Sequence, residues 1–184
     1  MKRLIIFSFL IMGMAGLVSA QESIKWYTIN EAVELNKKEP RIFIIDVYTD
    51  WCGWCKRMDA NTFSHPVIAS YINRNYYPVK LNAEQKNDII LEGRTYKYVA
   101  NGSRGYNELA AILLKGRLSY PSIVYMNSGL QVIEVVPGYK TPPQLEVYLV
   151  FFKEGIYAKK TITEFAQTFK GQIAPPEASG PDRP

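Results

Sequence analysis

The sequence predicts an α/β fold with a central mixed sheet and helices on both faces. Residues 41–48 are a continuous β-branched and aromatic run, which is typical of a strand buried on both faces. Strand and helix patterns alternate around this run, and such alternation implies parallel central strands covered by helices. Residues 122–126 and 131–136 flank a turn signal at residues 127–129, so we expect a hairpin that adds an antiparallel edge.

The first elements each carry a local signature. Residues 24–27 can form a short edge strand. Thr28 then caps a helix, with Glu31 completing a capping box, and Pro40 follows the end of this helix. A second helix is expected over about residues 52–61, directly after the buried strand.

The later elements are read in the same way. Ser64 and Pro66 mark the start of a helix that continues to about Asn73. Residues 77–82 predict a second central strand, and residues 141–152 predict the last core helix.

Two stretches lie outside this minimal plan. Residues 82–120 are too long for a simple connection, and we expect them to contain a helix at about residues 107–115, ended by Gly116. A short extra helix is expected within residues 161–170.

The chain of 184 residues has about the length of one domain, and its apolar fraction of 47% is enough for one core. We assign residues 21–173 to this domain, with an insertion at about residues 83–119. Residues 174–184 are expected to be a disordered tail.

Residues 1–20 have the layout of a secretory signal peptide, with a positively charged start, an apolar stretch and small residues at its end. We expect cleavage before Gln21 and an exported protein, periplasmic or otherwise extracytoplasmic. The alternative is an uncleaved membrane anchor, because the apolar run is close to the lower limit of ~17 residues for crossing a bilayer. Only that alternative predicts contact with a membrane.

The charge excludes one class of partner. Removing residues 1–20 takes away Lys2 and Arg3 and no acid, so the formal net charge falls from +5 to +3. The remaining basic residues are dispersed and form no concentrated basic face of the kind that nucleic-acid binding needs. We therefore expect no nucleic-acid partner. Separately, we expect a monomer.

The only two cysteines, Cys52 and Cys55, form a C-x-x-C motif at the start of the second predicted helix. A loop this short adds little stability, and structural disulfides of exported proteins normally join residues far apart. The positive end of a helix favours the thiolate of Cys52, which should attack a target disulfide, and Cys55 should then resolve the mixed disulfide. Zinc would need four ligands, whereas the chain offers two cysteines and His65. We predict no metal site and no cofactor besides this redox-active disulfide.

The segment around this motif, residues 46–56, resembles the active-site segment of thioredoxins, and the resemblance covers about residues 24–152. It implies a thioredoxin-like fold in which Asp46 is the family's buried acid and Lys80 is the lysine beside it. A buried carboxylate is costly to ionise, so the pKa of Asp46 should rise and the group could exchange a proton with Cys55. The alternatives are an idle, solvated Asp46 and a Lys80 that projects into solvent.

The same resemblance covers the substrate groove. Pro121, after Tyr120 and before a strand, stands where the family has its cis-proline, so the insertion becomes an expanded connection before that proline. Cis geometry there would expose the preceding backbone to an incoming peptide, although an ordinary turn proline is the alternative. The predicted substrate-binding residues are Trp51, Gly53, Trp54, Tyr120, Pro121 and Gly138.

The aromatic residues around the cysteines predict an apolar docking surface. Trp51, Trp54, Tyr120 and Tyr139 should cluster around the disulfide. We favour substrate contact for Trp54, whereas Trp51 could also pack partly inward.

Within the superfamily, the approach to Cys52 and the segment at residues 62–66 resemble the C-terminal thioredoxin-like domain of DsbD-type proteins. This implies transfer of electrons to protein disulfides outside the cytoplasm. The chain carries no transmembrane electron-carrying domain of its own, so it should depend on a separate extracytoplasmic or membrane electron donor. The bulk of Tyr120 and the insertion suggest restricted substrates.

The residues between the cysteines predict the direction of electron flow. Gly53 and Trp54 carry no charge that would stabilise the thiolate, so the disulfide should be less oxidising than that of strong oxidants. We expect a reductase or an isomerase. The alternative is a partner-specific binding protein or a metal-delivery chaperone with little general reductase activity, in which Met58 could serve as a ligand.

Overall fold

The computed structural model describes residues 22–174, so the predicted signal peptide and nearly all of the predicted tail lie outside the described residues. The helices are α1 (Ile29–Lys38), α2 (Gly53–Met58), the π-helix η1 (Asp59–Phe63), α3 (Pro66–Asn75), α4 (Glu108–Leu113), α5 (Pro142–Lys153), the short 3-10 helix η2 (Ile156–Ala158) and α6 (Ile162–Thr168). The strands are β1 (Ile42–Tyr48), β2 (Tyr76–Asn82), β3 (Ile89–Leu91), β4 (Arg94–Tyr96), β5 (Tyr98–Asn101), β6 (Arg104–Asn107), β7 (Ser122–Met126) and β8 (Val132–Pro137). None of the helices in this described part is both long and apolar enough to cross a membrane.

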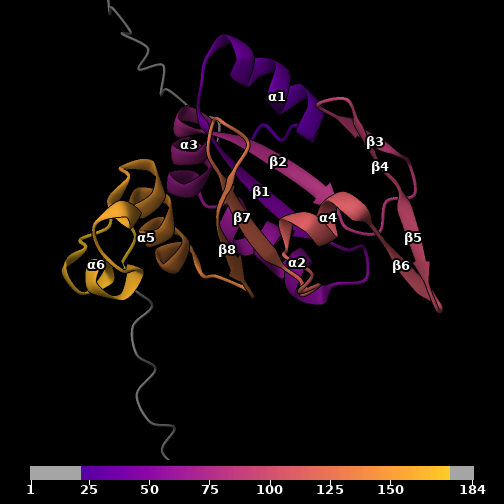
Figure 1. The fold of residues 1–184 in the computed structure, drawn as a ribbon. Helices are drawn as coiled ribbons and strands as arrows, with labels where there is room; N and C mark the ends of the chain where they lie inside the picture. The colour runs from indigo at the N-terminus through magenta and orange to yellow at the C-terminus, as the bar shows by residue number, and fades with distance from the viewer. Residues whose placement is uncertain (1–21, 175–184) are drawn as a thin grey trace, which may run out of the picture.

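A four-stranded mixed sheet forms the centre of the fold, in the order β2-β1-β7-β8 (Figure 1). The β1–β2 pair is parallel, whereas β7 pairs antiparallel with both β1 and β8. The hairpin therefore contributes an interior strand as well as an edge, and the expectation that β2 is a central strand was wrong. The reason is that residues 24–27 form a single bridge and no strand along the other side of β2, which leaves β2 at the edge of the sheet.

The expectation of a short edge strand at residues 24–27 was also wrong. Only Tyr27 forms a bridge, parallel to Val79 of β2. Its carbonyl accepts the amide of Lys80, and its own amide donates to Pro78. One residue thus covers part of the outer edge of β2.

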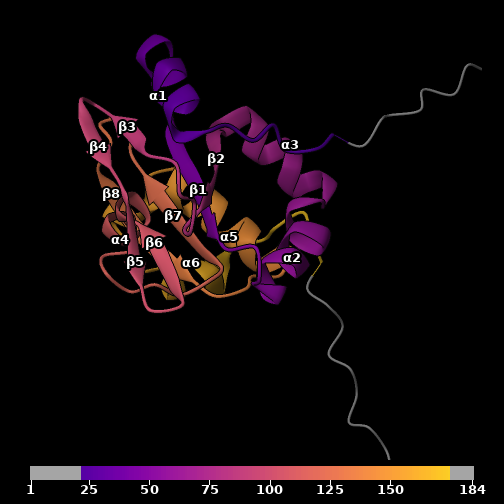
Figure 2. The ribbon, with the colours of Figure 1, turned by 90° about the vertical axis from the view of Figure 1, so that its right-hand side faces the viewer.

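Alternation along the strands divides the core into two layers. Odd-numbered residues of β1, such as Phe43 and Ile45, pack against α1 and α4. Ile44 points to the opposite face, where the core includes residues of α2, α3 and α5. Figure 2 shows α2 and α3 on one side of the sheet and α4 on the other. Because Asp46 continues the even-numbered row, it points toward the α2 side.

The predicted helices exist, with shifted ends. α1 begins at the expected capping box, in which Thr28 and Glu31 exchange hydrogen bonds. The helix expected over residues 52–61 is instead α2 followed by the π-helix η1. The N-cap position of α3 is held by His65, whose side chain makes no capping hydrogen bond, and the helix extends to Asn75.

The insertion holds two hairpins that we did not predict, β3–β4 and β5–β6, ahead of the expected helix α4. Their strands have three or four residues, which is too short for a periodic pattern to be recognised. Asn107 anchors the two hairpins. Its backbone N–H donates to the carbonyl of Ala83, which follows β2, and its side-chain amide donates to the carbonyl of Tyr96. The side-chain oxygen of Asn107 caps α4. Both hairpins lie along one side of the molecule (Figure 1).

The chain after α5 packs back on that helix. Residues of α6 and the following segment, including Phe165 and Ile173, pack against the α5 side of the core. Glu146 is buried and accepts the backbone amides of Gln172 and Ile173, at 2.7 and 3.0 Å. These charge-assisted hydrogen bonds satisfy a carboxylate that would otherwise be costly to bury.

Candidate active site

Cys52 and Cys55 form a disulfide at the start of α2. Cys52 is the N-cap residue, and its sulfur accepts the backbone N–H of Cys55 at 3.1 Å. An N–H group at a helix start stabilises negative charge on sulfur, as the sequence predicts. Both cysteines are buried, and Cys52, which keeps 5% of its residue surface exposed, is slightly more accessible than Cys55, which keeps 2%.

A group of three charged side chains, which we call the inner charge cluster, consists of Asp46, Lys80 and Asp59. Asp46 and Lys80 are direct partners in the parallel β1–β2 pair. Lys80 Nζ donates to Asp46 Oδ2 at 2.6 Å and to Asp59 Oδ1 at 2.5 Å. Asp46 Oδ1 has no hydrogen-bond partner among the described residues and is free to carry a proton.

Burial decides the acid strength of Asp46. Only 2% of its surface is exposed, and burial raises the pKa of its carboxyl to about 6, although the charge of Lys80 acts in the opposite direction. Burial lowers the pKa of Lys80, but its hydrogen bonds and charge interactions with Asp46 and Asp59 outweigh this, and its pKa is raised overall. Lys80 is therefore the cation of the cluster and does not project freely into solvent.

Aromatic rings surround the ammonium group of Lys80. Its Nζ lies 4.8 Å from the ring centre of Tyr48, 5.1 Å from that of Trp26 and 5.6 Å from that of Phe63. Such contacts stabilise a partly desolvated cation. They hold Lys80 between its two carboxylates.

Asp59 was not among the predicted site residues. It is the first residue of the π-helix η1 and lies four residues after Cys55. The spacing from Cys55 was a usable signal, because residues four apart share a helix face. The contact itself also depends on the π-helix, which the sequence did not predict.

The outward side of the disulfide carries a second group, which we call the outer aromatic surface: Trp51, Tyr120, Trp54 and Tyr139. Trp51 is 50% exposed and Trp54 is 56% exposed, so neither packs inward. Trp51 contacts Tyr120 edge to face at 6.1 Å between ring centres, and Trp54 contacts Tyr139 at 5.5 Å. Gly53 lies between the tryptophans, and no atom would obstruct a side chain there.

The remaining predicted residues meet across the β7–β8 end of the sheet. The Tyr120–Pro121 peptide bond is cis. Gly138 has a φ of +81°, a conformation that favours glycine, and its amide donates to the carbonyl of Pro121 at 2.8 Å. The structure thus joins the segment before β7 to the segment after β8.

Two arginines that we did not predict lie over the outer aromatic surface. The guanidinium of Arg57 lies 5.3 Å from the ring centre of Trp54 and 5.9 Å from that of Tyr139. The guanidinium of Arg104 lies 4.2 Å from the ring centre of Trp51. Arg57 follows Trp54 at helical spacing, which was a usable signal. Nothing in the sequence links Arg104 to Trp51, because a hairpin of the insertion makes that contact.

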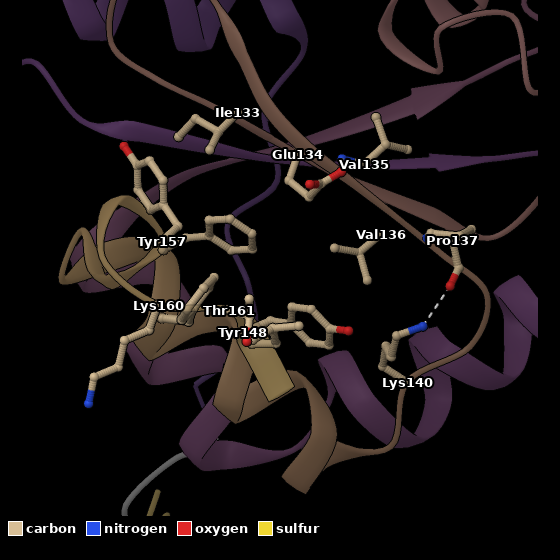
Figure 3. A pocket seen from close by; sticks show the side chains of 13 residues that line it. Ile133, Glu134, Val135, Val136, Pro137, Lys140, Tyr148, Tyr157, Lys160 and Thr161 are labelled. Carbon is tan, nitrogen blue, oxygen red and sulfur yellow. Dashed lines mark hydrogen bonds between the residues drawn. The ribbon is translucent and has the colours of Figure 1, made fainter. Parts of the chain in front are cut away.

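A hollow of about 710 Å³ lies away from the cysteines, between β8 and the C-terminal helices (Figure 3). Val136, Tyr148 and Phe152 contribute to its lining, and Lys140 donates to the carbonyl of Pro137 at its rim. It contains neither cysteine nor any predicted site residue. Size alone therefore does not identify the reactive site.

Residues 22–174 contain no group of three or more potential His, Cys, Asp or Glu metal ligands. Met58, considered above as a metal ligand, is fully buried in the core on the α2 side of the sheet. It does not reach the surface around the disulfide.

Comparison with known proteins identifies the fold. The profile of the Thioredox_DsbH family, described as a protein of unknown function, DUF255, matches residues 16–128. A solved DsbH oxidoreductase aligns over 82% of this chain and 96% of its own, with a TM-score of 0.52 and 15% identity. A proposed disulphide-isomerase from Bacteroides thetaiotaomicron aligns over 77% of this chain and 100% of its own, with a TM-score of 0.53 and 23% identity. A thioredoxin from Thermus thermophilus aligns over 69% of this chain and 85% of its own, with a TM-score of 0.50 and 14% identity. These likenesses confirm the thioredoxin fold predicted from the sequence.

One curated relative is a much longer protein. Spermatogenesis-associated protein 20 of Mus musculus is 25% identical over 126 residues, which is 68% of this chain. The aligned part covers 14% of that relative's length. Most of the mouse protein therefore has no counterpart in the aligned region.

Proposed function

Since this chain belongs to the Thioredox_DsbH family, we propose that it is an extracytoplasmic thiol–disulfide oxidoreductase that reduces or isomerises protein disulfides. Cys52 and Cys55 are its reactive groups, and it needs no cofactor besides their disulfide. The export part of this proposal rests on the pattern of residues 1–20.

One observation carries the proposal. The Cys52–Cys55 disulfide lies at a helix start, with the Cys52 sulfur accepting a backbone N–H and half-exposed tryptophans on both sides. A disulfide that served only to stabilise the fold would gain little from closing so short a loop. Exposed aromatic side chains beside it provide a surface on which a polypeptide can dock.

The first step starts from the protein in which both cysteines are reduced. The Cys52 thiolate attacks one sulfur of the target disulfide, the target S–S bond breaks, and the second target sulfur leaves as a thiolate that takes up a proton. A mixed disulfide between Cys52 and the target forms. The greater accessibility of Cys52 favours it over Cys55 as the attacking group.

The second step releases the target. Cys55 loses its proton and attacks the Cys52 sulfur, the mixed disulfide breaks, and the other target sulfur leaves as a thiol after protonation. Two electrons have then passed to the target, and the Cys52–Cys55 disulfide is restored. Asp46 is suited to accept the proton of Cys55, because its pKa of about 6 leaves it ionised but basic at neutral pH.

A separate dithiol protein must reduce the disulfide again before the next cycle, since two electrons leave the chain in each one. Gly53 and Trp54 add no charge between the cysteines, which supports a donor role over an oxidant role. We expect a reduction potential well below the value of about −120 mV that strong oxidants show. Equilibration with a glutathione buffer measures it, and a potential near that value would reverse the direction.

Reduction of insulin with dithiothreitol as the electron source tests the activity. The wild type should accelerate the reaction and Cys52→Ser should abolish the acceleration. Cys55→Ser should accumulate mixed disulfides with targets, because attack remains possible and resolution does not. A wild type no faster than Cys52→Ser would instead support a partner-specific binding protein.

A further inference from the structure

A groove of about 370 Å³ opens beside the disulfide, on the side of the insertion. One wall comes from the β5–β6 hairpin and the other from the segment that leads to the cis-proline. Its lining includes Trp51, Glu84, Arg104, Leu118 and Tyr120. The groove therefore reaches both the residue before Cys52 and the residue before Pro121.

The β5–β6 hairpin places Arg104 in the lining of this groove. Arg104 pairs with Asn101 at the tip of β5–β6, and its guanidinium stacks on Trp51. Gly105 follows, and a Cβ there would lie only 2.3 Å from the Tyr98 hydroxyl and 2.4 Å from the Val99 carbonyl. Only glycine fits that position, so the close packing of Tyr98 sets the path of the hairpin.

The charge of Arg104 is unpaired. In the described part of the chain, no carboxylate forms an ion pair with it. Glu84, a half-buried residue of the same groove, lies close enough to Tyr120 to raise the pKa of the phenol, after the larger effect of burial. The groove thus presents one free cation near Trp51 and one anion near Tyr120.

We propose that this groove receives an acidic side chain adjacent to the disulfide cysteine of a target polypeptide, and that Arg104 selects it. This inference rests on the proposed function, because it names the class of target for the same cysteines. Arg104 is a specificity residue and takes no part in sulfur exchange.

Charge complementarity argues for this occupant. A guanidinium that stacks on an indole keeps its N–H edge free to donate to a carboxylate, and such charge-assisted hydrogen bonds are stronger than neutral ones. Leu118, 38% exposed, and the exposed Trp51 can cover the aliphatic part of a glutamate. A basic side chain that entered the groove would be repelled by the like charge of Arg104.

Competition between matched peptides tests the proposal. Two mixed-disulfide peptides differ only in the residues on both sides of the cysteine, Glu in one and Gln in the other. The wild type should reduce the Glu peptide about 3- to 10-fold faster at low salt, as expected for one solvent-accessible charge contact. Raising the salt concentration should shrink the ratio.

The variants assign the preference to one residue. Arg104→Gln should bring the ratio to about 1, and Arg104→Glu should invert it. Arg94→Ala is the matched control, because Arg94 also stacks on an aromatic ring of the insertion, Tyr96 at 4.9 Å, but does not line the groove. Glu84→Gln should raise the ratio, since it removes the anion of the groove.

Each outcome has one meaning. A wild type that reduces both peptides equally well overturns the acidic-target inference and leaves the proposed function intact. A preference that persists in Arg104→Gln, or that disappears equally in Arg94→Ala, also overturns it. Failure to reduce either peptide or insulin contradicts the proposed function itself.

Discussion

On the inner side of the disulfide, Lys80 is held between the carboxylates of Asp46 and Asp59, whereas on the outer side Arg57 and Arg104 lie over tryptophan rings. In the described residues the outer arginines have no carboxylate partner. On the inner side Asp46 is buried and Lys80 is mostly buried, while Asp59 is exposed; on the outer side both arginines are exposed.

Because of this difference, the charges on the two sides can have different effects. Charges that are buried and paired shift each other's pKa and can move a proton, as the proposed resolution by Cys55 requires. Charges that are exposed and unpaired change no pKa in the core but can attract a partner. Substitutions on the inner side should therefore change pH dependence, and those on the outer side should change target choice.

The largest expected effect is on stability, from Asp46→Asn. The folded pKa of Asp46, about 6, lies above the ordinary value of 3.8, so ionised Asp46 destabilises the folded state. Between these values the folded wild type binds more protons than the unfolded chain, and its stability falls as the pH rises. At pH 8 the variant should be more stable than the wild type by up to about 3 kcal/mol.

Urea unfolding of both proteins from pH 3.5 to pH 8 measures this effect. The advantage of the variant should nearly vanish at the acid end, where Asp46 is mostly protonated in both the folded and the unfolded state. If Asp46→Asn is the less stable protein at pH 8, the ionised carboxylate stabilises the fold and the inner cluster has been misread.

Lys80→Met should act next most strongly, on the pKa of Asp46. Loss of the cation leaves only burial and the charge of Asp59, and both raise this pKa. We expect an upward shift of about one unit or more, of the size that a nearby opposite charge produces. An NMR titration of the Asp46 carboxyl carbon measures it, and a downward shift would contradict the pairing.

Asp59→Asn should shift the same titration in the opposite direction. The charge of Asp59 raises the pKa of Asp46. Once that charge is removed, the ammonium group of Lys80 interacts with the carboxylate of Asp46 alone. The side chain of Asp59 is 45% exposed, so we expect a downward shift of a few tenths of a unit, because solvent screens the charge. An unchanged titration would exclude Asp59 from the cluster.

Arg57→Ala should have the smallest effect on the inner side. Arg57 is exposed and its guanidinium lies over two aromatic rings, so the free energy of unfolding should change by less than about 0.5 kcal/mol. The pKa of Asp46 should not move. The contrast between the two sides would be lost if this variant changed the NMR titration as much as Asp59→Asn does.

Elements with strong local patterns could be predicted from the sequence. The capping box at Thr28 and Glu31, the apolar run of β1 and the C-x-x-C motif each depend on neighbours in the chain. The resemblance to thioredoxins implied that Asp46 and Lys80 are neighbours, and the parallel register of β1 and β2 in the structure places them opposite each other. The hairpins β3–β4 and β5–β6 carry no such pattern, because their strands are too short.

The sequence by itself determined the fold class and the redox pair, which follow from local periodicity and from a motif, whereas the partnership of Asp46 and Lys80 was an expectation from the resemblance to thioredoxins. Only the tertiary structure decided that β7 is an interior strand, that Asp59 shares Lys80 with Asp46, and that Arg104 lies on Trp51. The physical reason is that these contacts join segments whose spacing along the chain carries no information about their distance in space. Packing of the insertion and the π-helix brings them together.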